Sequence, residues 1–264
     1  MPTEIAKLLC RIPWEKWEKI LEDEPEWCYM WPLYQKYPFG TFAVTIVALG
    51  LNDFQLKGKA DEVYWPRIQN ILGNSDTPSS RSQLIAILRP FYQAERLTKL
   101  KSKRLDRFLK SELADSLWTA TPRYIAEDFE AIWVRLSIVM NQEPRAKTIV
   151  FAMKCLGISL LLAGEYGFDF SRIPIPVDSR IESLTQRVAF KEFEGRKDIQ
   201  GFWSEILWEL KIELPQLSMI HLDSLCWQIG ILGSSELKAY FGRLGLIEIG
   251  ENLISMIRAK NDLY

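Results

Sequence analysis

The chain has 264 residues, of which 25% are charged and 48% apolar, the composition of a globular rather than a disordered protein. Its 33 Lys and Arg residues nearly balance its 34 Asp and Glu residues, so the net charge of −1 excludes a protein that coats DNA through overall positive charge. No apolar stretch reaches the roughly 18 residues of a membrane span, and the N-terminus lacks a signal-peptide pattern. We therefore expect a cytoplasmic protein with no membrane partner.

Helical periodicity dominates the chain and evidence for strands is weak, so the sequence predicts an all-α protein. Residues 2–22 predict two short amphipathic helices. Residues 40–51 are apolar on nearly every face and predict a buried helix, and residues 60–72 predict an amphipathic one. A polar loop follows, in which Ser80 or Ser82 is the expected N-cap of the next helix.

The helix expected at residues 96–110 carries the strongest positive patch of the chain, with seven basic residues against one acid. The simpler interpretation of this patch is a solvated helix face. The functional interpretation is contact with the phosphates of a nucleic acid.

A helix–hairpin–helix pattern follows. Residues 123–140 predict an amphipathic helix, and after a short polar turn residues 147–164 predict a buried helix that is too short to span a membrane. Residues 168–181 predict an extended segment interrupted by prolines, which leads into a helix at Asp178. Residues 179–260 predict four more helices.

Few residue types are available for catalysis. The cysteines form no CxxC pair, which argues against a zinc ribbon or a Cys-ligated cluster, and the single histidine, His221, excludes a multi-His metal site. We therefore expect no zinc ribbon, Cys-ligated cluster or multi-His metal site. The remaining options are chemistry by Lys, Asp and Glu, or no chemistry at all.

Lys147 is a candidate amine nucleophile. It stands where a helix is expected to begin, so its charge faces the positive end of the helix dipole, and an apolar run follows it; both features favour the neutral amine. The alternative is an ordinary solvated lysine. Asp178 is first of all an expected N-cap, a role compatible with an ionised catalytic carboxylate.

Three stretches resemble a known family when taken in order: AKTIVFAMKCLG (146–157), IPIPVDSRIESLT (173–185) and HLDSLCW (221–227). They are similar to motifs of the archaeal 8-oxoguanine DNA glycosylases, the AGOG group of the helix-hairpin-helix DNA glycosylase superfamily. A weaker match, GKADEVYW (58–65), extends the resemblance toward the N-terminus.

The resemblance implies a bifunctional DNA glycosylase and AP lyase that excises 8-oxoguanine. Lys147 would attack C1′ of the flipped nucleotide and form a Schiff base that permits β-elimination, while Asp178 would help activate the amine and stabilise positive charge on the sugar. Two alternatives stay open. One is a related helical glycosylase with another base preference, and the other is a non-catalytic helical DNA-binding or adaptor protein.

The same motifs imply a base pocket. Phe151 and Trp227 match stacking aromatics, Asp223 matches a carboxylate that accepts hydrogen bonds from the purine, and Trp65 matches a further pocket tryptophan with a one-residue insertion before it. Glu26 stands where the family has a glutamine, and an ionised Glu accepts hydrogen bonds but cannot donate them. For the aromatics the alternative is core packing, and for Asp223 it is a surface carboxylate.

The hairpin NQEPRA lacks the glycine-rich turn of most helix-hairpin-helix motifs, so its backbone grip on a phosphate is in question. Residues of the basic patch could share this task. The candidate contacts to the DNA backbone are Arg145, Lys101, Lys103 and Arg104.

The resemblance implies two helical lobes with the lesion pocket between them. Residues 1–38 with 168–264 would form a terminal lobe, and residues 39–167 a central lobe that contains the helix-hairpin-helix, about 123–164. The chain would cross near residues 36–40 and 164–176. The expected partner is double-stranded DNA containing 8-oxoguanine, with single-stranded DNA left open, bound by a monomer at the nucleoid.

Overall fold

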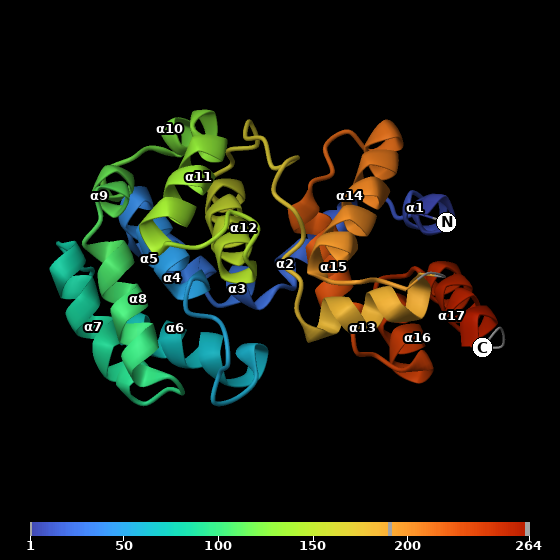
Figure 1. Ribbon diagram of the computed structural model, residues 1–264, viewed down its shortest axis with the longest axis horizontal. Coiled ribbons are helices and arrows are strands. Elements are labelled where there is room, and N and C mark those ends of the chain that lie inside the picture. Colours follow the sequence, from blue (N-terminus) through green and yellow to red (C-terminus); the bar gives the residue numbers. More distant parts are fainter. Residues whose placement is uncertain (1, 190–191, 262–264) are drawn as a thin grey trace. The chain divides into compact units, whose positions relative to one another are not determined.

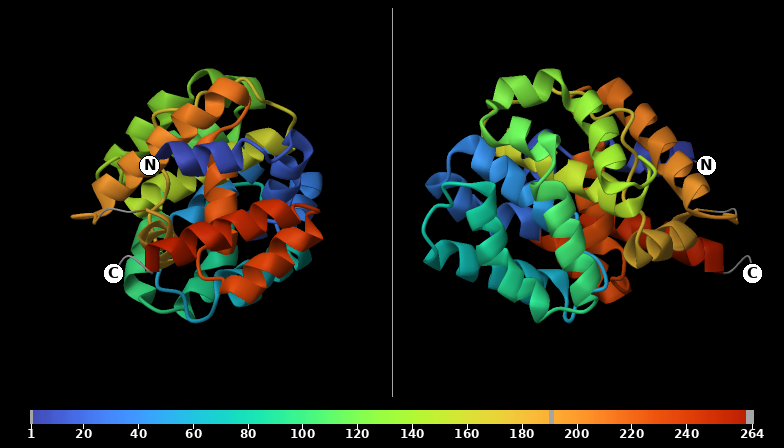
Figure 2. Two further views of the ribbon diagram at one scale, coloured as in Figure 1. Left: turned by 90° about the vertical axis from the view of Figure 1, so that its right-hand side faces the viewer. Right: turned by 60° about the vertical axis from the view of Figure 1, so that its left-hand side comes forward.

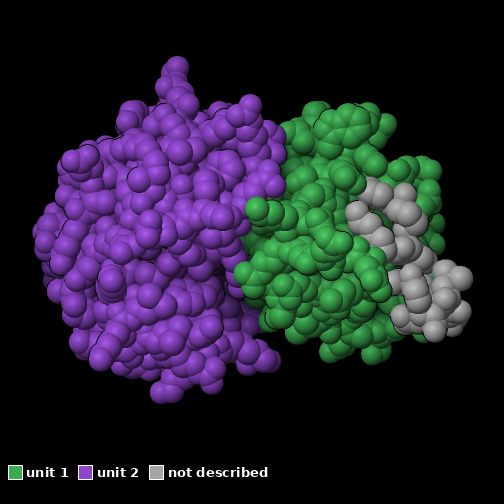
Figure 3. Space-filling view, viewed as in Figure 1, with its two compact units in different colours: residues 1–24, 174–264 green, residues 25–173 purple. Residues whose placement is uncertain are grey.

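The protein is described here by a computed structural model that covers residues 2–189 and 192–261, and every regular element in these ranges is a helix (Figure 1). The all-α class expected from the sequence is therefore confirmed. The helices form two compact units: residues 1–24 with 174–264, and residues 25–173 (Figure 3). In the described ranges, no helix combines the length and the apolar character needed to cross a membrane.

The unit of residues 25–173 is built around one apolar helix, α5. Its helices are α3 (Pro25–Cys28), α4 (Trp31–Lys36), α5 (Phe39–Gly50), the π-helix η1 (Ala60–Tyr64), α6 (Trp65–Asn74), α7 (Arg81–Gln93), α8 (Thr98–Leu109), α9 (Glu112–Trp118), α10 (Pro122–Glu127), α11 (Phe129–Met140) and α12 (Lys147–Leu162). Every residue of α5 from Gly40 to Gly50 is buried, as its apolar sequence predicts. Neighbouring helices α12, α9, α8 and α4 pack around it.

Two glycines let α5 approach its neighbours closely. A Cβ on Gly40 would lie 2.3 Å from the carbonyl oxygen of Trp118 in α9. A Cβ on Gly50 would lie 2.8 Å from Cys155 Sγ in α12. Real Cβ atoms do not make such short contacts, so a side chain at Gly40 would clash with the backbone of α9. One at Gly50 would displace the Cys155 side chain and crowd the Cα of Ala152, 3.1 Å away in the helix that Lys147 begins.

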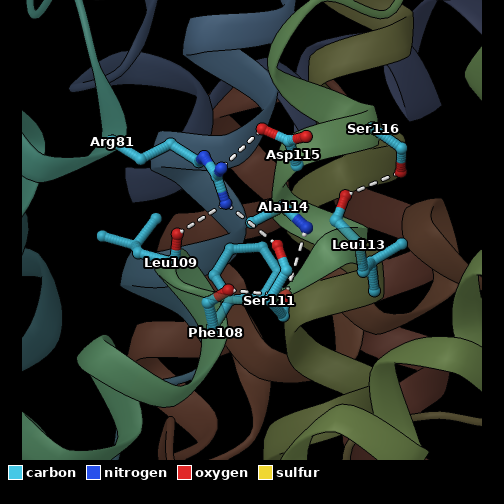
Figure 4. Close-up of polar contacts among 8 residues, drawn as sticks. All are labelled: Arg81, Phe108, Leu109, Ser111, Leu113, Ala114, Asp115 and Ser116. Carbon is cyan, nitrogen blue, oxygen red and sulfur yellow. Dashed lines mark hydrogen bonds and ion pairs between the residues drawn. The ribbon is translucent and has the colours of Figure 1, made fainter.

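The region of α7 to α9 is held together by Arg81 (Figure 4). Its guanidinium donates to the carbonyls of Leu109 at 3.0 Å and Ser111 at 2.9 Å, and it also pairs with Asp115. These contacts join the start of α7 to the junction between α8 and α9. The expected N-cap of α7 is confirmed as Ser80, which accepts a hydrogen bond from the backbone N–H of Gln83.

The first helix of the predicted helix-hairpin-helix is interrupted. Residues 122–127 form α10, Asp128 leaves helical geometry (φ −106°, ψ 14°), and α11 starts afresh at Phe129. Asp has a low helix propensity because its side chain competes for nearby backbone groups. The single helix expected over residues 123–140 was therefore wrong in its continuity, although its hairpin end at Met140 is close to the prediction.

The other unit combines the N-terminal helices with the C-terminal part of the chain. Its helices are α1 (Pro2–Leu9), α2 (Trp14–Glu22), α13 (Ser179–Val188), α14 (Arg196–Glu213), α15 (Met219–Ile229), α16 (Ser234–Arg243) and α17 (Ile247–Asn261). Helix α1 packs against α14 and α17, and α2 packs against α15. Helix α16 lies alongside α17 (Figure 2). The described part of residues 179–261 thus holds five helices, one more than the sequence predicted.

The chain leaves the first unit earlier than expected. The boundary follows Glu24 rather than the predicted crossing near residues 36–40. Helix α3 packs against α12, and α4 packs against α5, α6 and α12, so both belong to the unit of residues 25–173. Lys36 adds a hydrogen bond of 3.0 Å from its Nζ to the carbonyl of Gly73. The second boundary lies within the crossing expected at residues 164–176.

Candidate active site

Lys147 is the first residue of α12. The preceding residue, Ala146, has extended backbone angles (φ −61°, ψ 137°) and offers no side-chain cap, and the first turn carries no acidic residue. Lys147 and Phe151 are both half-buried and stand four residues apart, so they share one face of the helix. This face of α12 therefore carries an amine and an aromatic ring.

A further lysine lies on this face and was missed by the sequence analysis. Lys154 is buried, and its Nζ is 6.0 Å from the centre of the Phe151 ring, within the range of a cation–π contact. Its spacing of seven residues from Lys147 is the signal that would have identified it.

The hairpin between α11 and α12 forms without glycine. Asn141 takes the left-handed conformation (φ 51°, ψ 53°) that ends α11, and Asn is one of the few residues that adopt it readily. Trp133 Nε1 donates to the carbonyl of Pro144 at 2.8 Å, which ties the turn to α11. Arg145 is exposed on this hairpin, where it is accessible to solvent.

Lys101 was predicted to contact the DNA backbone, and the structure corrects this. Its side chain is fully buried, with Nζ 3.7 Å from Glu95 Oε2 and 5.3 Å from the centre of the Phe54 ring. Burial lowers the pKa of Lys101, although the charge of Glu95 opposes this shift. An ammonium enclosed by its own unit cannot reach a phosphate in solution. Lys103, two residues later, is exposed.

Arg104 was assigned the same role, and its hydrogen bonds are instead made inside the protein. Its guanidinium donates to the carbonyl of Leu51 at 3.1 and 2.9 Å, to Gln142 Oε1 at 2.8 Å and to Thr148 Oγ1 at 3.0 Å. Burial, with the nearby charge of Arg107, lowers the pKa of Arg104 to about 10. Arg104 is thus an internal cross-link.

Two further predicted pocket residues belong to the same unit. Glu26 is buried in α3, the helix that packs against α12. Trp65 is buried at the start of α6, and within the described chain its Nε1 has no hydrogen-bond partner. The π-helix η1 directly precedes Trp65, and a π-turn holds one more residue than an α-turn. It is the place where the one-residue insertion inferred from the sequence would be accommodated.

Asp178 is the N-cap of α13. Its Oδ1 accepts hydrogen bonds from the backbone N–H groups of Arg180 at 2.9 Å and Ile181 at 3.1 Å. The structural role expected from the sequence is therefore confirmed. The same bonds hold the carboxylate in a fixed orientation at the end of the Pro-rich segment.

Asp223 and Trp227 stand one turn apart on α15, which packs against α13. Asp223 is buried, whereas Trp227 is half-buried and carries the guanidinium of Arg180 3.9 Å from its ring centre. Gly230 permits this packing, since a Cβ there would lie 2.7 Å from the carbonyl oxygen of Arg180. The contact between Arg180 and Trp227 was not foreseen from the sequence.

His221 is structural, as expected. With Ser218 it forms a capping box at the start of α15, and its ring centre is 5.1 Å from that of Trp14. Burial lowers the pKa of His221 to about 4. Among the described residues, no group of three or more His, Cys, Asp or Glu side chains could hold a metal ion.

The candidate catalytic and base-pocket residues are divided between the two units. Lys147, Phe151, Glu26 and Trp65 belong to residues 25–173, and Asp178, Asp223 and Trp227 to the other unit. Each unit thus holds one residue of the catalytic pair expected from the sequence and at least one of the expected aromatic side chains.

The sequence profile of the family described as AGOG, N-glycosylase/DNA lyase, matches residues 6–246 of the chain. The chain belongs to the AGOG family. The resemblance inferred from the motifs is thereby confirmed, and the matched range contains every candidate residue named above.

Curated relatives of this AGOG family member are similar over part of their length. An N-glycosylase/DNA lyase of Methanopyrus kandleri is 33% identical over 59% of this chain and 59% of its own length. An N-glycosylase/DNA lyase of Thermococcus kodakarensis is 28% identical over 72% of this chain and 68% of its own length. The aligned chain thus spans less than two thirds of the Methanopyrus relative.

A solved structure shares the fold. It is Pa-AGOG, an 8-oxoguanine DNA glycosylase from Pyrobaculum aerophilum, crystallised in complex with 8-oxoguanosine. The TM-score is 0.72 at 19% sequence identity, and the match covers 97% of this chain and 95% of Pa-AGOG.

Proposed function

We propose that this AGOG family member is a bifunctional DNA N-glycosylase and AP lyase that excises 8-oxoguanine. The observation that carries the proposal is the family match over residues 6–246, a range that holds both Lys147 and Asp178. Relatives that bear the name N-glycosylase/DNA lyase support the reaction class. The Pyrobaculum protein crystallised with 8-oxoguanosine supports the choice of base.

In the proposed reaction the Lys147 amine attacks C1′ of the damaged nucleotide. A C1′–N bond forms as the C1′–N9 bond breaks, and its electron pair leaves with the base, which takes up a proton. Opening of the sugar ring and loss of the amine proton give a Schiff base. Removal of a C2′ proton then breaks the C3′–O bond and nicks the strand. Asp178 stabilises the positive charge that develops on the sugar.

The remaining residues suit recognition of an extruded purine. Phe151 and Trp227 offer ring faces for stacking, and Asp223 and Glu26 offer acceptors for purine N–H groups. Trp65 offers an indole N–H that makes no hydrogen bond within the described chain, and such a donor fits a purine carbonyl or ring nitrogen.

Double-stranded DNA is the proposed partner, and single-stranded DNA is tested beside it. Arg145 and Lys103 remain the candidate contacts to phosphates, because both are exposed. The reaction requires only Lys and Asp chemistry, so we propose that it proceeds without a metal or organic cofactor, in a monomer acting at the nucleoid.

Borohydride trapping tests the proposal. Incubated with an oligonucleotide that contains 8-oxoguanine, the wild type should become covalently linked to the DNA when borohydride reduces the Schiff base. Lys147→Gln should abolish the adduct and the strand cleavage while keeping DNA affinity. An adduct formed by Lys147→Gln would show that another amine is the nucleophile, and no adduct in the wild type would support a non-catalytic DNA-binding protein.

Base preference is tested with a panel of lesions in single-stranded and double-stranded oligonucleotides. Fastest trapping on 8-oxoguanine is expected, and faster trapping on another lesion would identify a glycosylase of different specificity. Trp227→Ala should lower the preference for the lesion more than the affinity for undamaged duplex. Equal losses in both would argue against a base-stacking role for Trp227.

A further inference from the structure

We propose that Arg104 is a positioning residue that fixes the first turn of α12, and with it the amine of Lys147. The inference rests on the proposed function, because it assigns Arg104 a role in that reaction. Arg104 touches no reacting atom in this proposal. It acts through Thr148, the neighbour of Lys147, and through the hairpin that precedes both.

The guanidinium joins three separate parts of the unit. Its Nε and one terminal nitrogen converge on the carbonyl of Leu51, the C-cap residue of α5. The other terminal nitrogen reaches Gln142 Oε1 in the hairpin at 2.8 Å. The bond to Thr148 Oγ1 at 3.0 Å reaches the second residue of α12. One planar group therefore sets the spacing of α5, the hairpin and α12.

The acceptors are also bonded to one another. Thr148 Oγ1 donates to Gln142 Oε1 at 3.1 Å, which closes a triangle of hydrogen bonds with Arg104. Phe54 lies on the guanidinium, with its ring centre 5.2 Å away. The cation also stands at the carbonyl end of α5, where the helix dipole favours positive charge. These contacts hold the cross-link in one geometry.

The start of α12 depends on such a cross-link because the helix lacks a side-chain cap of its own. The carbonyl of Ala146 accepts from the N–H groups of Ile149 and Val150, but its methyl side chain offers no acceptor to the N–H groups of the first turn. The long side chain of Lys147 is aimed by the backbone of this turn. A displacement of about 1 Å at a reacting group can cost about a hundredfold in rate, so the position of the turn matters for catalysis.

The contacts require arginine rather than any cation. Arginine presents five N–H donors in a rigid plane, whereas the ammonium of lysine is a compact charge that cannot reach acceptors on opposite sides. Arg104→Lys therefore keeps the charge and breaks the geometry. If Arg104 instead contacted a phosphate of the DNA, Arg104→Lys would retain activity, because lysine also binds phosphate.

The test combines single-turnover trapping with DNA affinity measured over a range of salt concentrations. Arg104→Lys should slow trapping on 8-oxoguanine DNA by about tenfold or more, with the Kd and its salt dependence unchanged. Thr148→Val, which replaces the hydroxyl with a methyl group of similar size, should also slow trapping. Thr148→Ser, which keeps the hydroxyl, should restore the wild-type rate.

Arg107→Lys is the matched control on the same helix. Within the described chain Arg107 donates a hydrogen bond to the carbonyl of Met140 at 3.0 Å and none to a residue of α12, so its substitution should leave the trapping rate unchanged. Thermal unfolding checks that each variant is folded at the assay temperature. If Arg104→Lys does not fold, the comparison of Thr148→Val with Thr148→Ser decides.

Trapping by Arg104→Lys and Thr148→Val at the wild-type rate would overturn the proposal while leaving the proposed function intact. A weaker Kd for Arg104→Gln, with a salt slope reduced by about one, together with wild-type binding and trapping by Arg104→Lys, would replace it with a phosphate contact. Failure of the wild type to form an adduct would refute both the proposed function and the positioning role.

Discussion

The helix that Lys147 begins and the helix that Asp178 caps start in opposite ways. Helix α13 starts with a carboxylate that accepts two backbone hydrogen bonds, an arrangement that stabilises almost any helix. Helix α12 starts with a lysine, without a side-chain cap and without an acid in its first turn. Stability alone accounts for Asp178 but gives no reason for Lys147. A cation is unfavourable at a helix N-terminus, so Lys147 indicates a functional site more strongly than Asp178 does.

After the loss of the Lys147 amine, the largest effect is expected from a variant that separates the catalytic role of Asp178 from its capping role. Asp178→Asn keeps a capping oxygen but loses the charge, and it should lower the rate of strand cleavage by about a hundredfold or more. The measurement is single-turnover cleavage of an 8-oxoguanine duplex. Near-normal cleavage by Asp178→Asn would show that Asp178 is only a cap, and the contrast between the two helix starts would lose its functional meaning.

The start of α15 extends the comparison, because its capping box contains the only histidine of the chain. The backbone N–H of Ser218 donates to His221 Nδ1, so protonation of this nitrogen removes an acceptor. The pKa of His221 is about 4 in the folded protein, against 6.5 ordinarily. The unfolded chain therefore binds the proton first, and the free energy of unfolding should fall by about 3 kcal/mol as the pH drops from 6.5 toward 4.

Denaturant titrations of wild type and His221→Gln across this range check the prediction. Glutamine at this position retains a capping box, so the variant should fold and lack the histidine contribution. Taking the difference between the two proteins removes the titration of the acidic residues. If the free energy of unfolding changed with pH in the same way in both proteins, the lowered pKa of His221 would be contradicted.

The contribution of Asp178 as an N-cap should be measurable in the free energy of unfolding, separately from activity. Asp178→Ala should lower the free energy of unfolding by about 1 kcal/mol, because two N–H groups of α13 lose their acceptor. Asp178→Asn should lose only a few tenths of a kcal/mol, since Asn is an equally good cap. Thermal and denaturant unfolding give both values. Equal stability losses in the two variants would point to the charge rather than the cap.

The smallest effect is expected for the stability of Lys147→Gln. Lys147 is half-buried and its helix has no cap to lose, so the free energy of unfolding should stay within about 0.5 kcal/mol of the wild-type value. Unfolding of this variant is measured alongside the trapping experiment. A loss well above this range would mean that Lys147 also supports the fold.

Local patterns in the sequence predicted much of the fold. Apolar residues on nearly every face identified the buried helices α5 and α12. N-cap chemistry identified Asp178 and reduced the cap of α7 to Ser80 or Ser82. The family motifs identified the candidate residues, but they could not separate a capping role from a catalytic one.

These local patterns could not predict contacts between residues that are distant in the sequence. The basic patch of α8 was read as one surface, yet Lys101 is enclosed by Glu95 and Phe54, and Arg104 bonds to Leu51 and to the hairpin. The composition of a helix gives the number of its charged residues, whereas tertiary packing determines which of them are exposed to solvent. The contacts of Lys101 and Arg104 arise from chain segments that come together only in the folded state.

The close approach of α5 and α12 at Gly50 has a mechanical consequence. A Cβ on Gly50 would lie only 3.1 Å from the Cα of Ala152 in α12, and such close packing should oppose movement of α12 along α5. The pair would serve as a stationary frame for the lysine, and any rearrangement that accompanies entry of a nucleotide would fall to other segments. Backbone amides in the middle of α5 and α12 should accordingly rank among the slowest in this unit to exchange with deuterated solvent.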